Sequence, residues 1–340
     1  MSQPIAKDKG PMERDTLRID PDATGIARAA AMLRAGQLVA FPTETVYGLG
    51  ADARQGEAVA GIYEAKGRPS FNPLIAHVPD LAHAEAIGMF NAAARALAER
   101  FWPGPLTLVV PLKAEAGIST LATAGLDSIA LRVPSHPVAR EILQAVGTPI
   151  VAPSANRSGR VSPTEADHVW ADLNGRIDAI VEGWSTPVGV ESTIVSCLGA
   201  EPTLLRPGGV TRAEIEEVLG HALADGAADA AKPVAPGLLE SHYAPQAAVR
   251  LNAHTIEPDE AALLFGPEPP PGLGDAKAHL NLSFRGDLRE AAANLFSMLR
   301  RLDVSGVTRI AVMPIPREGL GEAIEDRLKR AAAPRPSQGN

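Results

Sequence analysis

The sequence predicts an α/β protein with two domains, and three observations support this. The chain has 340 residues, enough for about two domains of ordinary size. Short apolar runs alternate with amphipathic stretches along most of it, which is the pattern of strands followed by helices. After residue 220 alanine, glycine and proline dominate, which indicates a linker. The predicted organisation is a disordered tail at 1–15, a domain at 16–220, a linker at 221–246, a second domain at 247–333 and a disordered tail at 334–340.

The first domain opens with a predicted strand at 16–19 and a helix at 23–35, in which apolar side chains recur at helical spacing before Gly36. Further strands are predicted at 38–41, 73–78, 106–110, 129–133, 149–152, 179–181, 192–196 and 203–205. Further helices are predicted at 57–65, 91–101, 137–146, 164–173 and 211–219. Thr211 and Glu214 have the spacing of a capping box, which marks the start of the last helix.

The second domain shows the same alternation on a smaller scale. Strands are predicted at 248–251, 262–265, 279–282 and 309–313, and helices at 287–302 and 320–330. The first of these helices carries one apolar stripe that runs from Leu288 to Leu302. Strands alternating with helices predict a small α/β domain with a largely parallel sheet.

Composition narrows the class of protein. Hydrophobic residues make up 45% and charged residues 21%, as in soluble globular proteins. No apolar run approaches the roughly 20 residues that span a bilayer, and the polar N-terminal stretch lacks the apolar core of a secretory signal. Cys197 is the only cysteine, which excludes an internal disulfide framework and fits a cytoplasmic protein. The net charge of −8 argues against broad, non-specific affinity for nucleic acid.

The stretch 42–53 carries the first signal of function. Two threonines, Glu44 and a tyrosine follow a buried strand, and two glycines come next. Such a density of polar groups predicts a loop that presents hydroxyls and a carboxylate to a ligand. Residues 48–53 also match the Gly-x-Gly-x-x-Ala dinucleotide fingerprint. Polar residues separate this match from its strand and no acidic residue ends a strand about 20 positions later, so we interpret the glycines as a turn that returns the chain to the scaffold.

Several polar groups stand at predicted element ends. Lys66 and Arg68 suit a phosphate-rich ligand, although cations at a helix end also offset the helix dipole. Ser154, Asn156 and Ser162 follow a strand end and either cradle phosphate or ribose or form an ordinary polar turn. No Gly-x-Ser-x-Gly elbow surrounds Ser154, no phosphate-binding P-loop motif is present, and the histidines show no metal-ligand spacing.

Arg132 lies inside an apolar strand, so its charge needs a partner. A ligand carboxylate, Glu44 and Glu191 are all candidates for that partner. The segments 191–193 and 206–209 place further polar groups at strand ends, and each is a weak signal by itself.

Taken together, these segments resemble the YrdC-like family in order and spacing. The matching segments are 41–53, 66–78, 102–107, 130–134, 152–156, 191–193 and 205–208. The tail at 236–245 and the domain after it resemble the two-domain form of the L-threonylcarbamoyladenylate synthases. The resemblance covers nearly all of the chain beyond residue 15.

The resemblance implies a twisted mixed α/β sheet with a concave cleft, joined to a small Rossmann-like domain. It also implies an enzyme, a nucleotidyltransferase that joins L-threonine, hydrogencarbonate and ATP into threonylcarbamoyl-AMP and releases pyrophosphate. The product would pass to a tRNA threonylcarbamoyl-transfer complex in the cytoplasm, for the threonylcarbamoyladenosine modification of tRNA. A weak RNA contact is expected, and no membrane contact.

The family's site residues transfer onto this sequence position by position. The resemblance assigns catalysis to Lys66, Arg68, Ser154 and Asn156. It assigns ATP binding to Arg68, Asn72, Ser128, Ser154, Ser162, Arg206 and Tyr243. It assigns L-threonine binding to Thr45, His77, Arg132, Ala152 and Ser192. Mg²⁺ is expected with ATP, and no protein ligand is assigned to a metal.

The linker is expected to close over the cleft as a lid. Residues 238–241 depart from the basic and aromatic pattern of many relatives, so we expect the lid contact from His242 or Tyr243. Two alternatives remain open at this point. A carbamoyl-adenylate-forming domain of the hydrogenase-maturation type shares the fold, but the single cysteine argues against its usual zinc modules. A non-catalytic double-stranded RNA-binding module would need a basic face, but not Thr45, His77 and Arg132 together.

Overall fold

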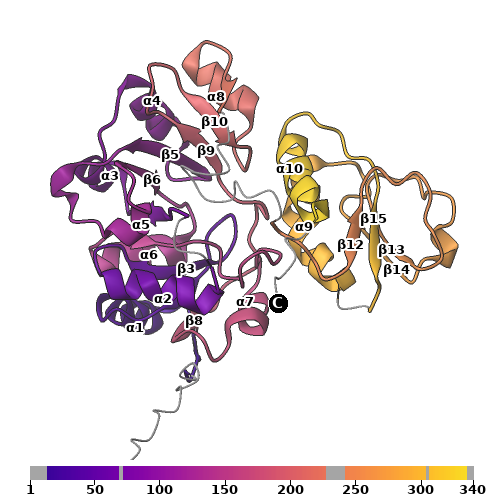
Figure 1. Cartoon of the computed structure of the whole chain (residues 1–340), viewed down its shortest axis with the longest axis horizontal. Helices are drawn as coiled ribbons and strands as arrows, with labels where there is room; N and C mark the ends of the chain where they lie inside the picture. The colour runs from indigo at the N-terminus through magenta and orange to yellow at the C-terminus, as the bar shows by residue number, and fades with distance from the viewer. Residues whose placement is uncertain (1–13, 69–71, 227–241, 304–305, 335–340) are drawn as a thin grey trace, which may run out of the picture.

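The computed structural model describes residues 14–68, 72–226, 242–303 and 306–334. These residues form two domains side by side, each built on its own sheet (Figure 1). The larger domain has a mixed sheet and the smaller a parallel one, which confirms the predicted α/β class. Most of the expected tails at 1–15 and 334–340 and of the expected linker at 221–246 lies outside the described residues. Within the predicted N-terminal tail, Arg14 pairs with Asp178 at 2.6 Å.

The large sheet has eleven strands in the order β1-β8-β2-β3-β7-β4-β6-β5-β9-β10-β11. Their bounds are β1 Leu17–Ile19, β2 Val39–Phe41, β3 Gly48–Asp52, β4 Ile75–His77, β5 Leu106–Pro111, β6 Ser128–Arg132, β7 Ile150–Val151, β8 Ala179–Val181, β9 Thr193–Ser196, β10 Thr203–Arg206 and β11 Ala224–Asp225. Strands β4 and β6 are parallel and in register, so that His77 lies beside Arg132. The carboxyl ends of these two strands therefore meet at one edge of the sheet.

Helices cover both faces of this sheet (Figure 1). Their bounds are α1 Ala23–Arg34, α2 Gly56–Lys66, α3 Leu81–Ile87, α4 Ala92–Phe101, α5 Thr120–Thr123, α6 Pro137–Val146, α7 Ala166–Leu173 and α8 Arg212–Leu219. Residues of β2 alternate between two buried clusters, as the two-residue period of a strand requires. Val39 packs with α1 and α6, whereas Ala40 belongs to the cluster that includes α2, α4, α7 and α8.

The smaller domain has the order β12-β15-β13-β14, with all neighbours parallel. Its elements are β12 Ala248–Arg250, β13 Glu260–Leu264, β14 Ala278–Asn281, α9 Leu288–Asp303, β15 Arg309–Val312 and α10 Leu320–Ala332. The predicted stripe of α9 is buried from Ala291 to Leu302, together with Phe296. Helices α9 and α10 lie between the small sheet and the larger domain (Figure 1), which places them next to the site described below.

One prediction is wrong in an informative way. The glycines of 48–53 belong to strand β3, which pairs antiparallel with β2, and do not form a turn. A Cβ at Gly50 would come within 2.7 Å of the Phe41 ring, so this glycine allows close packing between strands. Helices α3 and α5 and strand β11 were not predicted, because each is short. The capping box at Thr211 and Glu214 is confirmed.

Candidate active site

A cavity opens where several strands of the large sheet end. Its lining includes Thr45, Arg68, His77, Arg132, Ala152, Ser154, Ser192, Arg206 and Tyr243, which were all predicted as site residues. His77 ends β4, Arg132 ends β6 and Arg206 ends β10, while Ala152 follows β7 and Ser192 precedes β9. The chain therefore brings residues that are far apart in sequence to one place by ending its strands there, as is usual for ligand sites in α/β sheets.

Arg132 is buried and faces Glu44, one of its predicted partners. Arg132 Nη2 and Glu44 Oε1 lie 2.8 Å apart as an ion pair. Neither atom has hydrogen-bond geometry with any residue in the described ranges, and the same holds for Glu44 Oε2. This buried pair therefore keeps unused hydrogen-bonding capacity, so that Arg132 can donate hydrogen bonds to a ligand carboxylate.

His77 is neutral in this site. Burial, and after it the neighbouring Arg132, lowers the pKa of His77 to about 3. Its Nδ1 is buried without a hydrogen-bond partner among the residues that the structure describes. A neutral imidazole with an open nitrogen can accept or donate a hydrogen bond to a polar ligand.

The neutral His77 is expected to make the fold sensitive to acid. In the unfolded chain a histidine takes up a proton near pH 6.5, whereas His77 in the folded chain does so only near pH 3. Stability must therefore fall as the pH drops between these values, and His77→Gln should reduce this slope by about 1.4 kcal/mol per pH unit. Urea unfolding between about pH 4 and pH 6 measures the slope. The same change at the exposed His279 controls for the loss of one histidine, and an unaltered slope in His77→Gln would contradict the assignment.

Several cations lie near His242, another residue of the cavity lining. Burial is the main cause that holds the pKa of His242 well below its ordinary value, and the positive charges of Arg68, Lys66, Arg206 and Arg330 act in the same direction. These four cations therefore lie near enough to the His242 ring to lower its pKa. A concentration of positive charge in a buried cleft is what a polyphosphate requires.

The ammonium group of Lys66 does not face the cavity, as a contact to phosphate would require, but contacts the backbone of a neighbouring loop. Its ammonium group donates hydrogen bonds to the carbonyl oxygens of Ser154 and Asn156, and Lys66 is not among the residues that line the cavity. Burial, and next the nearby Arg68, holds the pKa of Lys66 well below its ordinary value. Lys66 thus fixes the backbone of the Ser-x-Asn loop.

Four more predicted residues lie outside the cavity lining. Asn72 is buried, and its carbonyl accepts a hydrogen bond from the Tyr63 hydroxyl at 2.9 Å. Asn156 donates from Nδ2 to the carbonyl oxygens of residues 157 and 160. Ser162 donates to Glu191 at 2.6 Å. Ser128 stands at the start of β6, on the same face as Arg132 but four positions earlier.

The end of the linker reaches the cavity. His242 and Tyr243 line it, and Tyr243 is buried with its ring stacked on Phe296 of α9 at 5.5 Å between centroids. The backbone of Tyr243 is left-handed, with φ 61°. The expected contact of His242 or Tyr243 with the nucleotide is consistent with this position, while residues 227–241 of the proposed lid lie outside the described residues.

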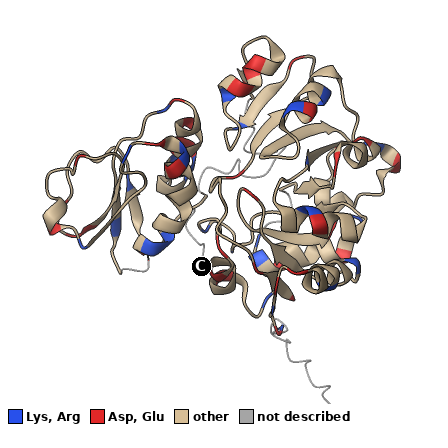
Figure 2. Cartoon of the chain, turned by 180° about the vertical axis from the view of Figure 1, so that it is seen from behind, with Lys and Arg blue, Asp and Glu red and all other residues tan. Residues whose placement is uncertain are grey.

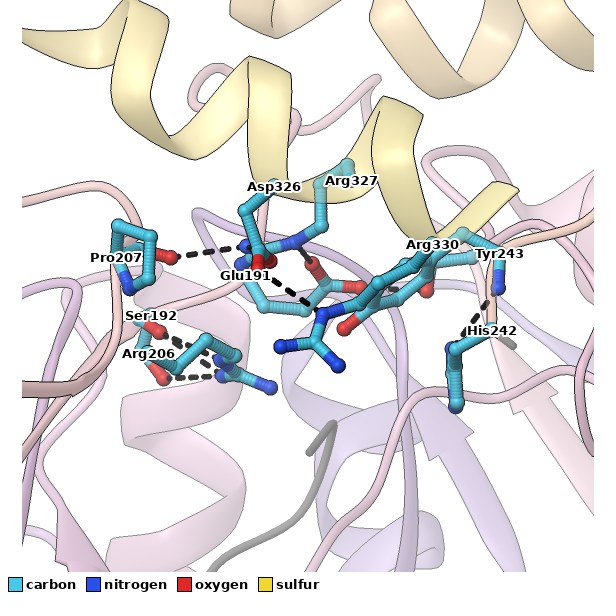
Figure 3. A network of polar contacts seen from close by, with 10 residues as sticks. Glu191, Ser192, Arg206, Pro207, His242, Tyr243, Asp326, Arg327 and Arg330 are labelled. Carbon is cyan, nitrogen blue, oxygen red and sulfur yellow. Dashed lines mark hydrogen bonds and ion pairs between the residues drawn. The ribbon is translucent and has the colours of Figure 1, made fainter. Parts of the chain in front are cut away.

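Sequence reasoning missed the group behind the cavity (Figure 3). Glu191 was considered as a partner for Arg132 and as part of a polar segment at a strand end, without a partner in the second domain. Its Oε2 instead accepts a hydrogen bond from Arg327 Nε at 2.7 Å, and Arg327 lies in α10 of the other domain. The only signal in the sequence was a glutamate directly before a site serine. No sequence pattern links Glu191 to an arginine 136 residues away.

The described part of the chain holds no cluster of three or more histidine, cysteine, aspartate or glutamate side chains that could bind a metal ion. None of its helices combines the length and apolar composition of a membrane crossing.

Comparisons with known proteins agree on one family. Residues 31–208 match the family model of Sua5, YciO and YrdC proteins, described as telomere recombination, and residues 210–333 match the C-terminal domain of threonylcarbamoyl-AMP synthase. The chain is 44% identical over 324 residues to the threonylcarbamoyl-AMP synthase of Bacillus subtilis, which covers 91% of this chain and 93% of that protein. It is 42% identical over 320 residues to that of Pyrococcus abyssi, covering 89% and 93%. The crystal structure of P. abyssi Sua5 complexed with L-threonine has a TM-score of 0.84 at 37% identity, over 93% of this chain and 97% of that one.

Proposed function

The chain belongs to the Sua5, YciO and YrdC family that includes the threonylcarbamoyl-AMP synthases, and on this premise we propose that it makes L-threonylcarbamoyladenylate from L-threonine, hydrogencarbonate and ATP. One observation carries the proposal. A single cavity joins a side suited to an amino acid, with Arg132 and His77, to a side suited to phosphates, with Arg68 and Arg206. An adenylate-forming enzyme needs both sides within reach of one another.

The reaction needs no side-chain nucleophile. The threonine amine attacks the carbon of hydrogencarbonate, and loss of water leaves a carbamate. A carbamate oxygen then attacks the α-phosphorus of ATP as the bond to the β-phosphate oxygen breaks, and pyrophosphate leaves. The protein contributes positioning of the reactants and neutralisation of the charge on the phosphates.

We assign the amino acid to the side of the cavity that holds the Arg132–Glu44 pair. The threonine carboxylate would take bidentate hydrogen bonds from Arg132 and displace Glu44 from that role. Thr45, His77 and Ser192 would orient the polar groups of threonine, and Ala152 would line the same pocket.

We assign ATP to the cationic side. Arg68 and Arg206 would contact the phosphates directly, and Lys66 would act from behind the Ser154–Asn156 loop or turn towards the phosphates when they arrive. The other nucleotide contacts would come from Asn72, Ser128, Ser162 and Tyr243.

Mg²⁺ would enter as part of the substrate. Its usual ligands are carboxylates and phosphate oxygens, but Glu44 and Glu191 at the cavity are each paired with an arginine. The phosphates and water would therefore hold the ion, and its chemical contribution would be to neutralise phosphate charge.

The product would pass to a tRNA threonylcarbamoyl-transfer complex in the cytoplasm. Acidic and basic residues are interspersed on the helices of both domains (Figure 2). This distribution and the net charge of −8 favour at most a weak RNA contact.

Pyrophosphate release from ATP with hydrogencarbonate is expected to require L-threonine. The assay compares release with threonine, with serine and without an amino acid, and mass spectrometry identifies the adenylate formed. Equal release with and without threonine would refute the threonine assignment. Threonine-independent turnover with carbamoyl phosphate would instead support the hydrogenase-maturation type of reaction.

A further inference from the structure

One arginine of the smaller domain is buried directly behind the site. Arg327 of α10 is fully buried, whereas arginine side chains are usually exposed to solvent. Its Nε donates to Glu191 Oε2 at 2.7 Å, and its Nη1 donates to the carbonyl oxygen of Pro207 at 2.9 Å. Its guanidinium lies 5.3 Å from the centroid of the Tyr243 ring. A single side chain thus contacts three separate segments of the chain (Figure 3).

Two of these contacts, Glu191 and Tyr243, line the cavity themselves, and Pro207 is next to a residue that does. Glu191 precedes Ser192, and Pro207 follows Arg206. Arg206 Nη2 donates to the carbonyl oxygen of Ser192 at 2.9 Å, which links the two segments. Arg327 itself is not among the residues that line the cavity.

We propose that Arg327 is a positioning residue of the synthase site: it fixes Glu191, Pro207 and Tyr243, and so places Ser192 and Arg206 for their substrates. This inference rests on the proposed function. It gives the smaller domain a role, because that domain supplies a side chain on which the geometry of the site depends.

A second ion pair connects the domains away from the cavity and serves as a comparison for Arg327. Glu322, also in α10, pairs with Arg212 of α8 at 2.7 Å, and both side chains remain partly exposed. Neither residue lines the cavity. If Arg327 only held the domains together, its removal should resemble the removal of Glu322.

Loss of Arg327 should also change how Glu191 titrates. Burial by itself raises the pKa of Glu191, but Arg327, Arg206 and the Ser162 hydroxyl hold it below its ordinary value. The titratable and charged groups that face this cluster are Arg206 from β10, Tyr243 from the linker, and Arg327 with its partner Asp326 from α10. Without Arg327 the pKa of Glu191 must rise, and activity that needs the carboxylate is then lost as the pH falls through the new value.

The test compares Arg327→Met, Arg327→Lys, Glu191→Gln and the double variant Glu191→Gln/Arg327→Met, with Glu322→Gln as the matched control. Pyrophosphate release gives kcat and the KM for ATP across pH, and thermal unfolding reports the fold. We expect Arg327→Met to lose about tenfold or more in kcat/KM for ATP, mainly through a higher KM, and to gain an acidic limb in its pH profile. The double variant should lack that limb, and Glu322→Gln should stay within about twofold of the parent.

A folded Arg327→Met protein with the parent's pH profile, or with a loss no larger than that of Glu322→Gln, would overturn the proposal. If Arg327→Met does not fold, the double variant Glu191→Gln/Arg327→Met is the test, because it leaves neither the Glu191 nor the Arg327 charge buried without its partner. A tenfold loss of kcat/KM for ATP in this variant supports the proposal, and the parent's kcat/KM overturns it. A parent protein without threonine-dependent pyrophosphate release refutes the proposed function, and this inference with it. A working parent with an unaffected Arg327→Met variant refutes this inference alone.

Discussion

Replacing Arg132 by alanine is expected to raise the KM for L-threonine by about 100-fold or more and to change the KM for ATP by less than about threefold. Arg132 is the buried cation on the amino-acid side of the cavity, and its Nη2 has hydrogen-bonding capacity that no described residue uses. A bidentate contact with a carboxylate in such a place is strong, because water does not compete for it. Steady-state kinetics with each substrate varied in turn measures both constants.

The same change leaves Glu44 buried without its cation, which costs about 3–5 kcal/mol of stability. The double variant Glu44→Gln/Arg132→Met removes both charges and should keep the fold while it still loses threonine binding. Arg95→Ala, which removes an exposed arginine paired with Glu85, is the matched control. A similar rise in both KM values would rule out a specific role for Arg132 in holding the threonine carboxylate.

Replacing Arg68 by alanine is expected to lower kcat by about 100- to 1,000-fold with little change in the KM for threonine. Arg68 lines the cavity on the side where Lys66 and Arg206 also gather. Charge moves onto the leaving pyrophosphate in the transition state, so a cation placed there lowers the barrier more than it strengthens substrate binding. Single-turnover pyrophosphate release at saturating ATP isolates this step.

Arg68→Lys should recover only part of the loss, because an ammonium group lacks the planar, bidentate geometry of a guanidinium. Arg157→Ala serves as the control, since Arg157 is exposed in the loop after Ser154. If Arg68→Ala raised the KM for ATP and left kcat unchanged, Arg68 would contribute uniform binding and no stabilisation of the transition state.

The sequence predicted most of the fold because local patterns decide most of it. The buried apolar run of β2, the apolar stripe of α9 and the capping box of α8 all follow from residues close in sequence. The residues of the cavity could also be predicted, since polar residues that follow apolar runs end up together when strands share an edge. The family resemblance then assigned them to two substrates.

Contacts between distant residues could not be predicted in the same way. Arg132 had two possible glutamate partners, and only the packing of the loop at 42–47 selects Glu44 over Glu191. The partner of Glu191 comes from another domain, and no sequence pattern distinguishes Arg327 from the other arginines of its helix. Gly50 was misread because the turn-forming freedom of glycine is a local property, whereas its contact with Phe41 depends on the neighbouring strand.

The left-handed backbone of Tyr243 has a consequence for how the linker can move. This conformation costs an ordinary residue about 1–2 kcal/mol, and here the stacking of the ring on Phe296 and the hydrogen bond from the Ala244 amide to the Gly159 carbonyl hold it in place. If the ring leaves its place, the main reason for the left-handed turn is lost and the backbone relaxes to its commoner region. We therefore expect the ring and the main chain of Tyr243 to move together.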